Sequence, residues 1–256
     1  MGWQLPPSDG RGGGMGVGPG STPLTGFSIV LIENADGSVL DRLRSAGADV
    51  STVPVPRSSA GSDHNGVRRT VHATCAGMVD AVVFTSADAS LAFLDAAAHA
   101  GRYAAVISAM RHEVVAAAVG PISAAPLREA GLEPLVPDRH RLSALVRAVA
   151  EHLEQERVRE VVTVGGVLRL RGQEASLDGE PLRLAPVPLA MLRAMARTPG
   201  DVLDRHRLLT ALPGTGDLHA VEMAVARLRR AIGRPDVVQT VVKRGYRLRL
   251  PSQDGG

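Results

Sequence analysis

The sequence has few aromatic residues, almost no lysine and a single cysteine. Only six of its 256 residues are aromatic, and Lys243 is the one lysine among its basic side chains. Cys75 has no partner for a disulfide within the chain, and no group of cysteines and histidines has the spacing of metal ligands. The sequence therefore predicts neither a disulfide scaffold nor a metal or cofactor site, and it fits a reducing cytoplasm.

Long apolar runs are also missing. Residues 1–25 are rich in glycine and proline, and they lack the apolar core of a signal peptide. No later stretch reaches the roughly 18 apolar residues that a membrane-spanning helix needs. We therefore expect a cytoplasmic protein with no membrane partner. Residues 1–25 are expected to be a disordered tail, because they hold too little apolar surface to fold.

Charge is distributed unevenly along the chain. Residues 1–158 contain 13 basic and 16 acidic side chains, whereas residues 159–256 contain 16 basic and 10 acidic ones. The C-terminal part is thus where a polyanion would bind. A basic face that is simply solvated explains the same counts, so charge alone does not choose between the two interpretations.

Residues 26–155 have the pattern of an α/β domain. Strands are expected at 27–33, 50–55, 81–84 and 115–119, where short β-branched runs are apolar on both faces, as in a parallel sheet covered by helices. Helices are expected at 38–46, 87–98, 123–130 and 141–153, with Gly47 and Gly131 ending two of them in the left-handed conformation. The charged stretch 151–160 is expected to end the last of these helices and to link it to a second domain.

Residues 161–251 have a different pattern. Short strands are expected at 167–170, 174–177 and 182–184, with a hairpin turn at Asp178-Gly179. Helices are expected at 188–197, 204–211 and 217–232. The chain then closes with strands at 239–242 and 246–250, which flank the basic turn Lys243-Arg244-Gly245. Two strands around a basic turn form a wing, and the fold class predicted for this part is a winged helix-turn-helix.

The third of these helices is the most informative. Val221, Val225, Leu228 and Ile232 recur at helical spacing and form one apolar stripe. At 100° per residue, Met223, Ala226, Arg227 and Arg230 point the other way. A helix anchored in the core with arginine on its free face suits the major groove of DNA. Arg229 lies at the flank, where it would meet a phosphate or a carboxylate of its own domain.

Four motifs in this region resemble the OmpR/PhoB-type winged-helix domain. They are Glu174-Ala-Ser-Leu-Asp-Gly-Glu-Pro-Leu, Thr198-Pro-Gly-Asp-Val-Leu-Asp-Arg, residues 221–230 and Thr240-Val-Val-Lys-Arg-Gly-Tyr-Arg. The resemblance implies double-stranded DNA as a partner, with RNA polymerase and a second copy of the chain as further candidates. The DNA-binding residues that we expect are His219, Met223, Arg227, Arg229, Arg230, Lys243 and Arg244.

This sequence departs from the family at several positions of the resemblance. Ala220 and Ala224 stand where the family often has polar contact residues, and Val242 replaces a common arginine of the wing. We expect Tyr246 to pack within the domain rather than stack on a base. A phosphorylated receiver domain is excluded as the N-terminal partner, because its chemistry needs a lysine in an acidic pocket and the only lysine is Lys243.

Two loops of the N-terminal half each follow a strand and open a helix. They contain Thr85, Ser86, Gly120, Ile122 and Ser123. Backbone N–H groups and a hydroxyl at a helix N-terminus can bind a carboxylate or phosphate. Taken alone, however, ordinary N-capping is the better interpretation of both loops.

The surroundings of these loops resemble uroporphyrinogen-III synthase. The similar segments are Val79-Asp-Ala-Val-Val-Phe-Thr-Ser-Ala, Ala118-Val-Gly-Pro-Ile-Ser-Ala-Ala-Pro-Leu and Pro137-Asp-Arg-His-Arg-Leu. The resemblance implies a cofactor-free enzyme of the hydro-lyase class that cyclises hydroxymethylbilane in tetrapyrrole biosynthesis. It also implies that the five loop residues hold the carboxylates of a tetrapyrrole precursor.

The similar segment is about half the length of that family, so part of the cleft has no counterpart here. We therefore expect no turnover from these 256 residues, and we assign no catalytic residue. The preferred hypothesis is a transcriptional regulator whose partial synthase-like domain senses a ligand or forms dimers. The alternative is an active uroporphyrinogen-III synthase with an appended DNA-binding domain.

Overall fold

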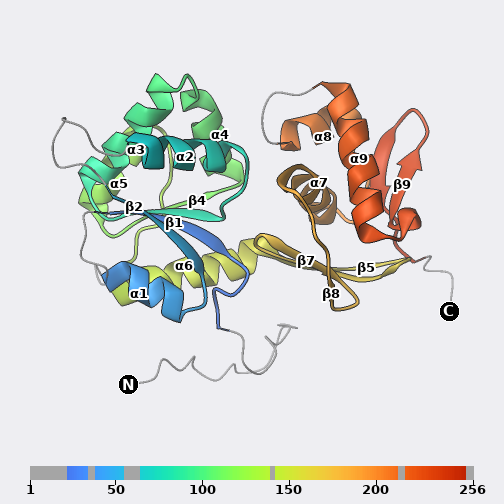
Figure 1. The fold of residues 1–256 in the computed structure, drawn as a ribbon, viewed down its shortest axis with the longest axis horizontal. Helices are drawn as coiled ribbons and strands as arrows, with labels where there is room; N and C mark the ends of the chain where they lie inside the picture. Colours follow the sequence, from blue (N-terminus) through green and yellow to red (C-terminus); the bar gives the residue numbers. More distant parts are fainter. Residues whose placement is uncertain (1–21, 34–37, 55–63, 139–141, 213–216, 252–256) are drawn as a thin grey trace.

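The computed structural model describes residues 22–33, 38–54, 64–138, 142–212 and 217–251 of the chain. An N-terminal α/β part and a C-terminal part of helices and small sheets lie side by side (Figure 1). Among the described helices, none combines the length and the apolar composition that crossing a membrane would take.

The α/β part is built on a parallel sheet. The strand order among the described residues is β2-β1-β3-β4, and every neighbouring pair is parallel. This confirms the predicted helix-covered parallel sheet. Its elements in chain order are β1 (Ser28–Glu33), α1 (Ser38–Ser45), β2 (Asp49–Pro54), α2 (His64–Cys75), β3 (Ala81–Phe84), α3 (Ala87–His99), α4 (Tyr103–His112), β4 (Val115–Ala118), α5 (Pro121–Glu129) and α6 (Leu142–Arg157).

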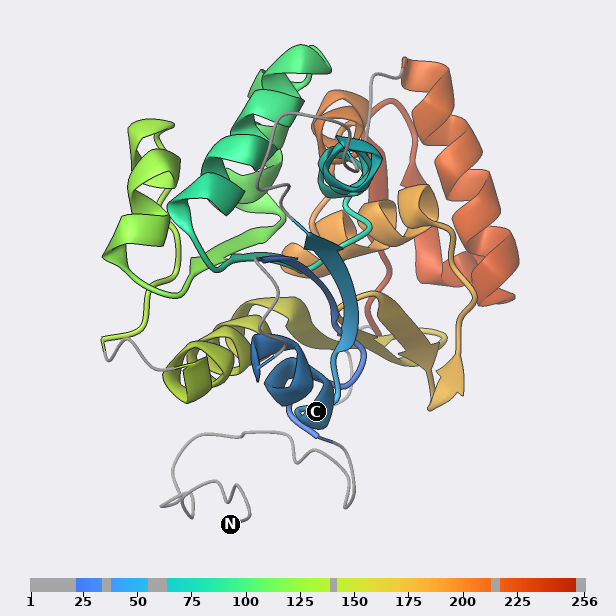
Figure 2. The same ribbon diagram turned by 60° about the vertical axis from the view of Figure 1, so that its left-hand side comes forward.

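Consecutive residues of β1 enter two different cores. Val30 and Ile32 pack with α2, α3, α4 and α5, whereas Ile29 and Leu31 pack with α1 and α6. The two groups of helices cover opposite faces of the sheet (Figures 1 and 2). Both faces of β1 are therefore buried, which is why its sequence is continuously apolar rather than alternating.

Two helices of this part were not predicted. Helix α2 has a polar sequence that contains Gly66, Arg68 and Arg69, and it lacks a broad apolar stripe. Helix α4 follows α3 after only Ala100, Gly101 and Arg102, without the intervening strand that a strict alternation of strands and helices would demand. Both helices are held by packing on the sheet, where Val71 and Val106 are fully buried.

The C-terminal part has its own core, formed by strands on one side and helices on the other. Its described strands form an antiparallel sheet in the order β5-β6-β7-β8 and a separate hairpin of β9 and β10. Its elements are β5 (Val158–Thr163), β6 (Gly166–Arg171), β7 (Glu174–Leu177), β8 (Glu180–Pro181), α7 (Pro186–Arg197), α8 (Arg205–Ala211), α9 (Leu218–Ile232), the 3-10 helix η1 (Pro235–Val237), β9 (Val238–Val241) and β10 (Gly245–Leu248).

The hairpin between β7 and β8 has the predicted turn. Asp178 and Gly179 both have positive φ, 51° and 85°, as a two-residue turn of the primed type requires. The carboxylate of Asp178 accepts a hydrogen bond from the backbone N–H of Val167 at 2.8 Å and pairs with Arg234 at 2.7 Å. The hydrogen bond from the Val167 N–H is the main cause that lowers the pKa of Asp178, and the hydrogen bond and charge of Arg234 lower it further.

Three predictions about this fold are wrong. Residues 151–160 do end the last helix of the α/β part, but they include no separate linker, because α6 runs to Arg157 and β5 begins at the next residue. The strand expected at 182–184 lies instead at Glu180–Pro181. The expected disordered tail ends too late, since Leu24 is fully buried in the α/β core. Residues 1–21 of that tail lie outside the described residues.

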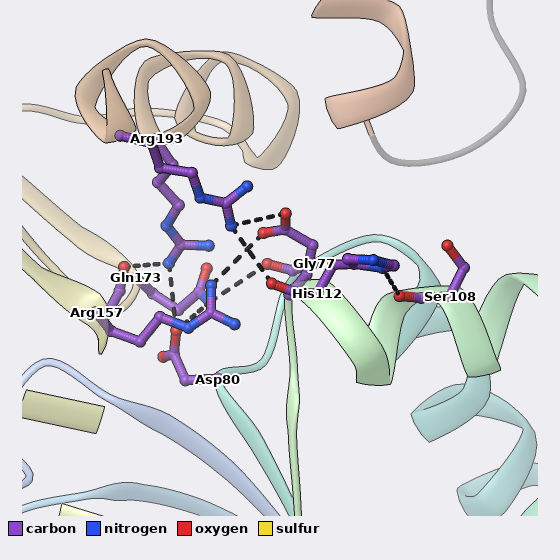
Figure 3. A network of polar contacts seen from close by, with 10 residues as sticks. Gly77, Asp80, Ser108, His112, Arg157, Gln173 and Arg193 are labelled. Atoms are coloured by element: carbon purple, nitrogen blue, oxygen red, sulfur yellow. Dashed lines mark hydrogen bonds and ion pairs between the residues drawn. The ribbon is translucent and has the colours of Figure 1, made fainter. Parts of the chain in front are cut away.

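The C-terminal part packs against the amino-terminal edge of the parallel sheet. Asp80 directly precedes β3, and its carboxylate accepts hydrogen bonds from Ser28 N at 2.9 Å, Gln173 Nε2 at 3.1 Å and Arg193 at 3.3 Å (Figure 3). Arg193 also donates to the carbonyl of Gly172. The side chain of Asp80 is 1% exposed and that of Arg193 is 13% exposed, so this contact between the two parts is largely shielded from water.

Burial sets the electrostatics of this contact. It raises the pKa of Asp80, against the opposing effects of the Arg193 charge and the Ser28 N–H, and it lowers the pKa of Arg193 and Arg157. A second ion-pair cluster lies next to it, where Glu113 meets Arg197 at 2.8 Å and Arg157 at 3.5 Å. Removing both charged groups from water is costly, so the pairs fix the geometry of the contact more than they stabilise it.

Candidate nucleic-acid interface and anion-binding loops

Helix α9 is defined by signals at both ends. The carboxylate of Asp217 accepts a hydrogen bond from the backbone N–H of Ala220 at 3.0 Å, which caps the helix N-terminus. Gly233 ends it with φ of 70°, a left-handed conformation that glycine adopts at little cost. The helix ends at the predicted residue, Ile232, and begins one residue after the predicted start, with Asp217 as its N-cap.

One face of α9 is buried as predicted. Val221, Val225, Leu228 and Ile232 all lie in the C-terminal core. Ala224 is buried with them at 1% exposure, so it has no free surface for a contact with DNA. A larger polar residue there would have to displace the core.

The opposite face of α9 is exposed and basic. Figures 1 and 2 place α9 on the side of the C-terminal part that is turned away from the α/β sheet. His219, Met223, Arg227 and Arg230 are exposed on it. Within the described part of the chain, the side chains of Arg227 and Arg230 make no hydrogen bond and no ion pair. Glu222, which shares this side of the helix, pairs with Arg205 at 3.2 Å.

Arg229 has a different environment. Its guanidinium donates to the carbonyl of Val238 at 2.6 and 2.9 Å and to Thr240 Oγ1 at 2.8 Å, and it lies 6.0 Å from the ring centre of Tyr246. Its partners are thus a carbonyl and a hydroxyl of β9 rather than a carboxylate. Tyr246 is 6% exposed, which confirms that it packs within the domain.

The wing turn joins β9 to β10. Val242, Lys243 and Arg244 are exposed there, and Arg244 N donates to Val241 O at 2.9 Å. Lys243 has φ of 62°, a left-handed conformation that is unfavourable for a residue with a side chain. The turn therefore presents two cations beside α9 at the cost of local backbone strain.

The two predicted anion-binding loops lie at the carboxyl ends of β3 and β4, which pair in parallel with Phe84 opposite Ala118. In the first loop, Ser86 Oγ accepts from Ala89 N at 3.1 Å and Thr85 Oγ1 donates to Ile32 O at 3.3 Å. Capping of α3 is thus observed, as the simpler interpretation expected.

The second loop opens α5 without a side-chain cap at Gly120. Ser123 is buried, and its carbonyl accepts a hydrogen bond from Ser90 Oγ at 2.7 Å. Ile122 is 79% exposed. The structure thus brings the two loops to one edge of the sheet, but it commits the hydroxyls of the first loop to contacts within the chain.

Sequence reasoning missed the residues that join the two parts. Asp80, Gln173 and Arg193 are far apart in the chain, and no local spacing marks them as partners. Within the described part of the chain, no group of three or more histidine, cysteine, aspartate or glutamate side chains could hold a metal ion.

Two protein families match the chain in succession. Residues 29–177 match the family described as uroporphyrinogen-III synthase HemD, and residues 179–248 match the family described as the C-terminal part of transcriptional regulatory proteins. The first match extends over β5, β6 and β7. We place these strands with the C-terminal part instead, because Val161, Leu170 and Leu177 are buried in its core.

Curated relatives of this chain include transcriptional regulators. The transcriptional regulatory protein AfsQ1 of Streptomyces coelicolor is 32% identical over 117 residues, which is 43% of this chain and 52% of the relative. The response regulator protein PmrA of Pseudomonas aeruginosa is 33% identical over 120 residues, which is 45% of this chain and 53% of the relative. The chain thus spans about half the length of these two relatives.

Solved structures of two kinds each cover a share of this chain. Uroporphyrinogen III synthase of Thermus thermophilus has 26% sequence identity and a TM-score of 0.34, with 52% of each chain covered. The DNA-binding domain of RstA from Klebsiella pneumoniae, solved in complex with the RstA box, has 26% identity and a TM-score of 0.31, with 35% of this chain and 96% of that chain covered. Because the first family match spans more than half of the 256 residues, the chain belongs to the uroporphyrinogen-III synthase family, and its C-terminal third is an OmpR/PhoB-type DNA-binding domain of transcriptional regulators.

Proposed function

We propose that the protein is a transcriptional regulator that inserts α9 into the major groove of double-stranded DNA and sets its wing against the neighbouring minor groove. The observation that carries this proposal is the pair Arg227 and Arg230, which are exposed on a helix whose opposite face is buried. Guanidinium groups in that position can bridge guanine O6 and N7 or bind phosphate. His219 and Met223 extend the same face, and Lys243 and Arg244 add cations at the wing.

Arg229 has a supporting role in this proposal. Its guanidinium holds β9 against α9 through Val238 and Thr240. It therefore fixes the position of the wing relative to the recognition helix, and contact with DNA falls to the neighbouring arginines.

A salt titration of DNA binding tests the proposal. We expect the double variant Arg227→Ala/Arg230→Ala to bind a duplex more weakly, and its plot of log affinity against log salt to be flatter by about 0.9 for each phosphate that the variant no longer neutralises. Arg183→Ala is the matched control, because Arg183 is an exposed arginine of the same domain outside α9 and the wing. If the double variant bound DNA like the unchanged protein, the assignment of α9 would be wrong.

For the synthase-like part we propose ligand sensing or dimer formation rather than catalysis. The first candidate loop uses the hydroxyls of Thr85 and Ser86 within the chain, which leaves backbone groups near Gly120 and Ile122 as the donors for a tetrapyrrole precursor. Incubation of the purified protein with hydroxymethylbilane is expected to give no enzymatic uroporphyrinogen III. Formation of that product would favour the alternative function, an active synthase with an appended DNA-binding domain.

RNA polymerase and a second copy of the chain are further partners that we propose from the family resemblance. Light scattering of the protein with and without an operator duplex would measure copies per duplex. A single copy on every bound duplex would contradict the dimer.

A further inference from the structure

A cleft of about 640 Å³ lies between the two parts of the molecule. Residues of α2 and α4 form one wall, and residues of α7 and α8 form the other. Among the described residues, the exposed face of α9, the wing turn and the loops at Thr85 and Gly120 do not contribute to its lining. The cleft is therefore distinct from both candidate sites described above.

The lining of the cleft is rich in arginine. It includes Arg102, Arg193, Arg197 and Arg207, and Glu113 is the one acidic residue among the described residues that line it. The charges of Arg193 and Arg197 are balanced by Asp80 and Glu113. Within the described part of the chain, Arg102 and Arg207 have no carboxylate partner. Two cations are therefore uncompensated at the same cleft.

These two arginines come from different parts of the molecule. Arg102 immediately precedes α4 in the α/β part, and its guanidinium contacts the thiol of Cys75. Arg207 lies in α8 of the DNA-binding domain and is exposed. A molecule in the cleft would thus meet a guanidinium from each wall.

Thr74 also borders the cleft. It is fully buried and its Oγ1 is inaccessible, so a molecule in the cleft would not reach that hydroxyl.

We propose that the interdomain cleft binds a small organic anion with at least two carboxylate or phosphate groups, held between Arg102 and Arg207. Guanidinium binds either group through paired charge-assisted hydrogen bonds. A volume of about 640 Å³ is in the range of small-molecule sites. Because the ligand contacts both parts and α8 packs against α9, binding of the ligand would also influence the recognition helix. This effect on α9 rests on the proposed function, whereas the binding itself does not.

Isothermal titration calorimetry on the full chain at low salt tests the proposal, with citrate as the carboxylate probe and inorganic pyrophosphate as the phosphate probe. We expect saturable binding of at least one probe, and the comparison of the two identifies the preferred group. Arg207→Gln, which replaces an exposed side chain, should weaken binding about fivefold. The double variant Arg102→Gln/Arg207→Gln should weaken it at least about thirtyfold.

Two controls make the result specific. Arg128→Gln removes an exposed arginine of α5 that does not line the cleft, and its affinity should equal that of the unchanged protein. Arg227→Ala/Arg230→Ala should also bind the probe normally, even if it no longer binds DNA. If neither probe saturates, or if only the α9 variant fails to bind the probe, the cleft is not the anion site. If the double variant fails to fold, Arg207→Gln alone decides, and unchanged affinity in it overturns the proposal.

Discussion

Gly245 shows how closely the wing is fitted to the rest of its domain. It has φ of 139°, and a Cβ there would overlap the carbonyl oxygen of Leu203. That carbonyl accepts a hydrogen bond from Tyr246 N at 3.0 Å, and Leu203 N donates to Tyr246 O at 2.9 Å, so the backbone cannot move away without breaking these bonds.

We therefore expect Gly245→Ala to lower the free energy of unfolding by about 3 kcal/mol, as measured by urea denaturation. Gly233→Ala is the control. It has positive φ of 70° but nothing within 4 Å of its Cβ, so only conformational strain of about 1 kcal/mol applies. Equal losses in the two variants would mean that the clash with Leu203 does not matter.

Arg193 is the nearest cation to the buried carboxylate of Asp80. Arg193→Met leaves that carboxylate without its main partner, so we expect a loss of about 3 kcal/mol of unfolding free energy at pH 7. Burial already raises the pKa of Asp80, which means that the folded state binds this proton more tightly than the unfolded chain does. The stability contributed by Asp80 is thus present below its unfolded pKa and lost as pH rises through its folded pKa.

The deficit of Arg193→Met should accordingly shrink as the pH falls and Asp80 becomes protonated. Chemical denaturation of both proteins between about pH 7 and about pH 4 measures this difference. A deficit that stayed constant or grew towards acid would contradict the assigned pairing.

At the residue scale, periodicity predicted the exposed arginines of α9 but not the contacts of Arg229 beside them. Arg227 and Arg230 follow from the 3.6-residue repeat, because the apolar stripe fixes the opposite face. The contacts of Arg229 with β9 depend on how the wing folds back, and the pairing of Asp80 with Arg193 depends on how the two parts pack. Neither set of contacts can be predicted from the spacing of residues in the sequence.

At the scale of elements, α9 depends on its N-cap. Asp217→Ala removes the acceptor for Ala220 N, and we expect it to cost about 1 kcal/mol of unfolding free energy and to weaken DNA binding by fraying the first turn. Asp217→Ser keeps an acceptor and should retain most of the stability. Thermal unfolding of the two variants gives the comparison, and equal melting temperatures would exclude a capping role.

Short strands bounded by turn signals were the easiest elements to predict. The range of β3 was predicted to the residue, because a short apolar run between turn signals admits few alternatives. Strand β5 was missed because its sequence continues a charged helical stretch, and only its antiparallel pairing with β6 makes it a strand. Pairing between strands is tertiary information, which overrides local propensity.

At the scale of the whole molecule, Arg171 ties the two parts together. Its guanidinium donates to Thr25 O and Pro23 O at 2.7 Å, pairs with Glu154 at 3.1 Å and lies 5.0 Å from the ring centre of Phe27. These partners all belong to the α/β part, whereas Arg171 itself ends β6.

We expect the unchanged protein to unfold in one calorimetric transition and Arg171→Ala to separate it into two. Arg169→Ala is a matched control on the same strand, because Arg169 is 62% exposed and pairs only locally with Glu160. Two transitions in the unchanged protein would show that the parts already unfold independently.

The direct junction of α6 with β5 has a mechanical consequence. Arg159 braces it by donating to Gln155 O at 2.9 Å and Val158 O at 2.8 Å. Because no linker separates the two elements, we expect a rotation of the C-terminal part on DNA to be passed directly to α6, which is about 24 Å long and packs against the parallel sheet. Bending of the duplex would therefore also move the α/β part, because no flexible linker at this junction would absorb the motion.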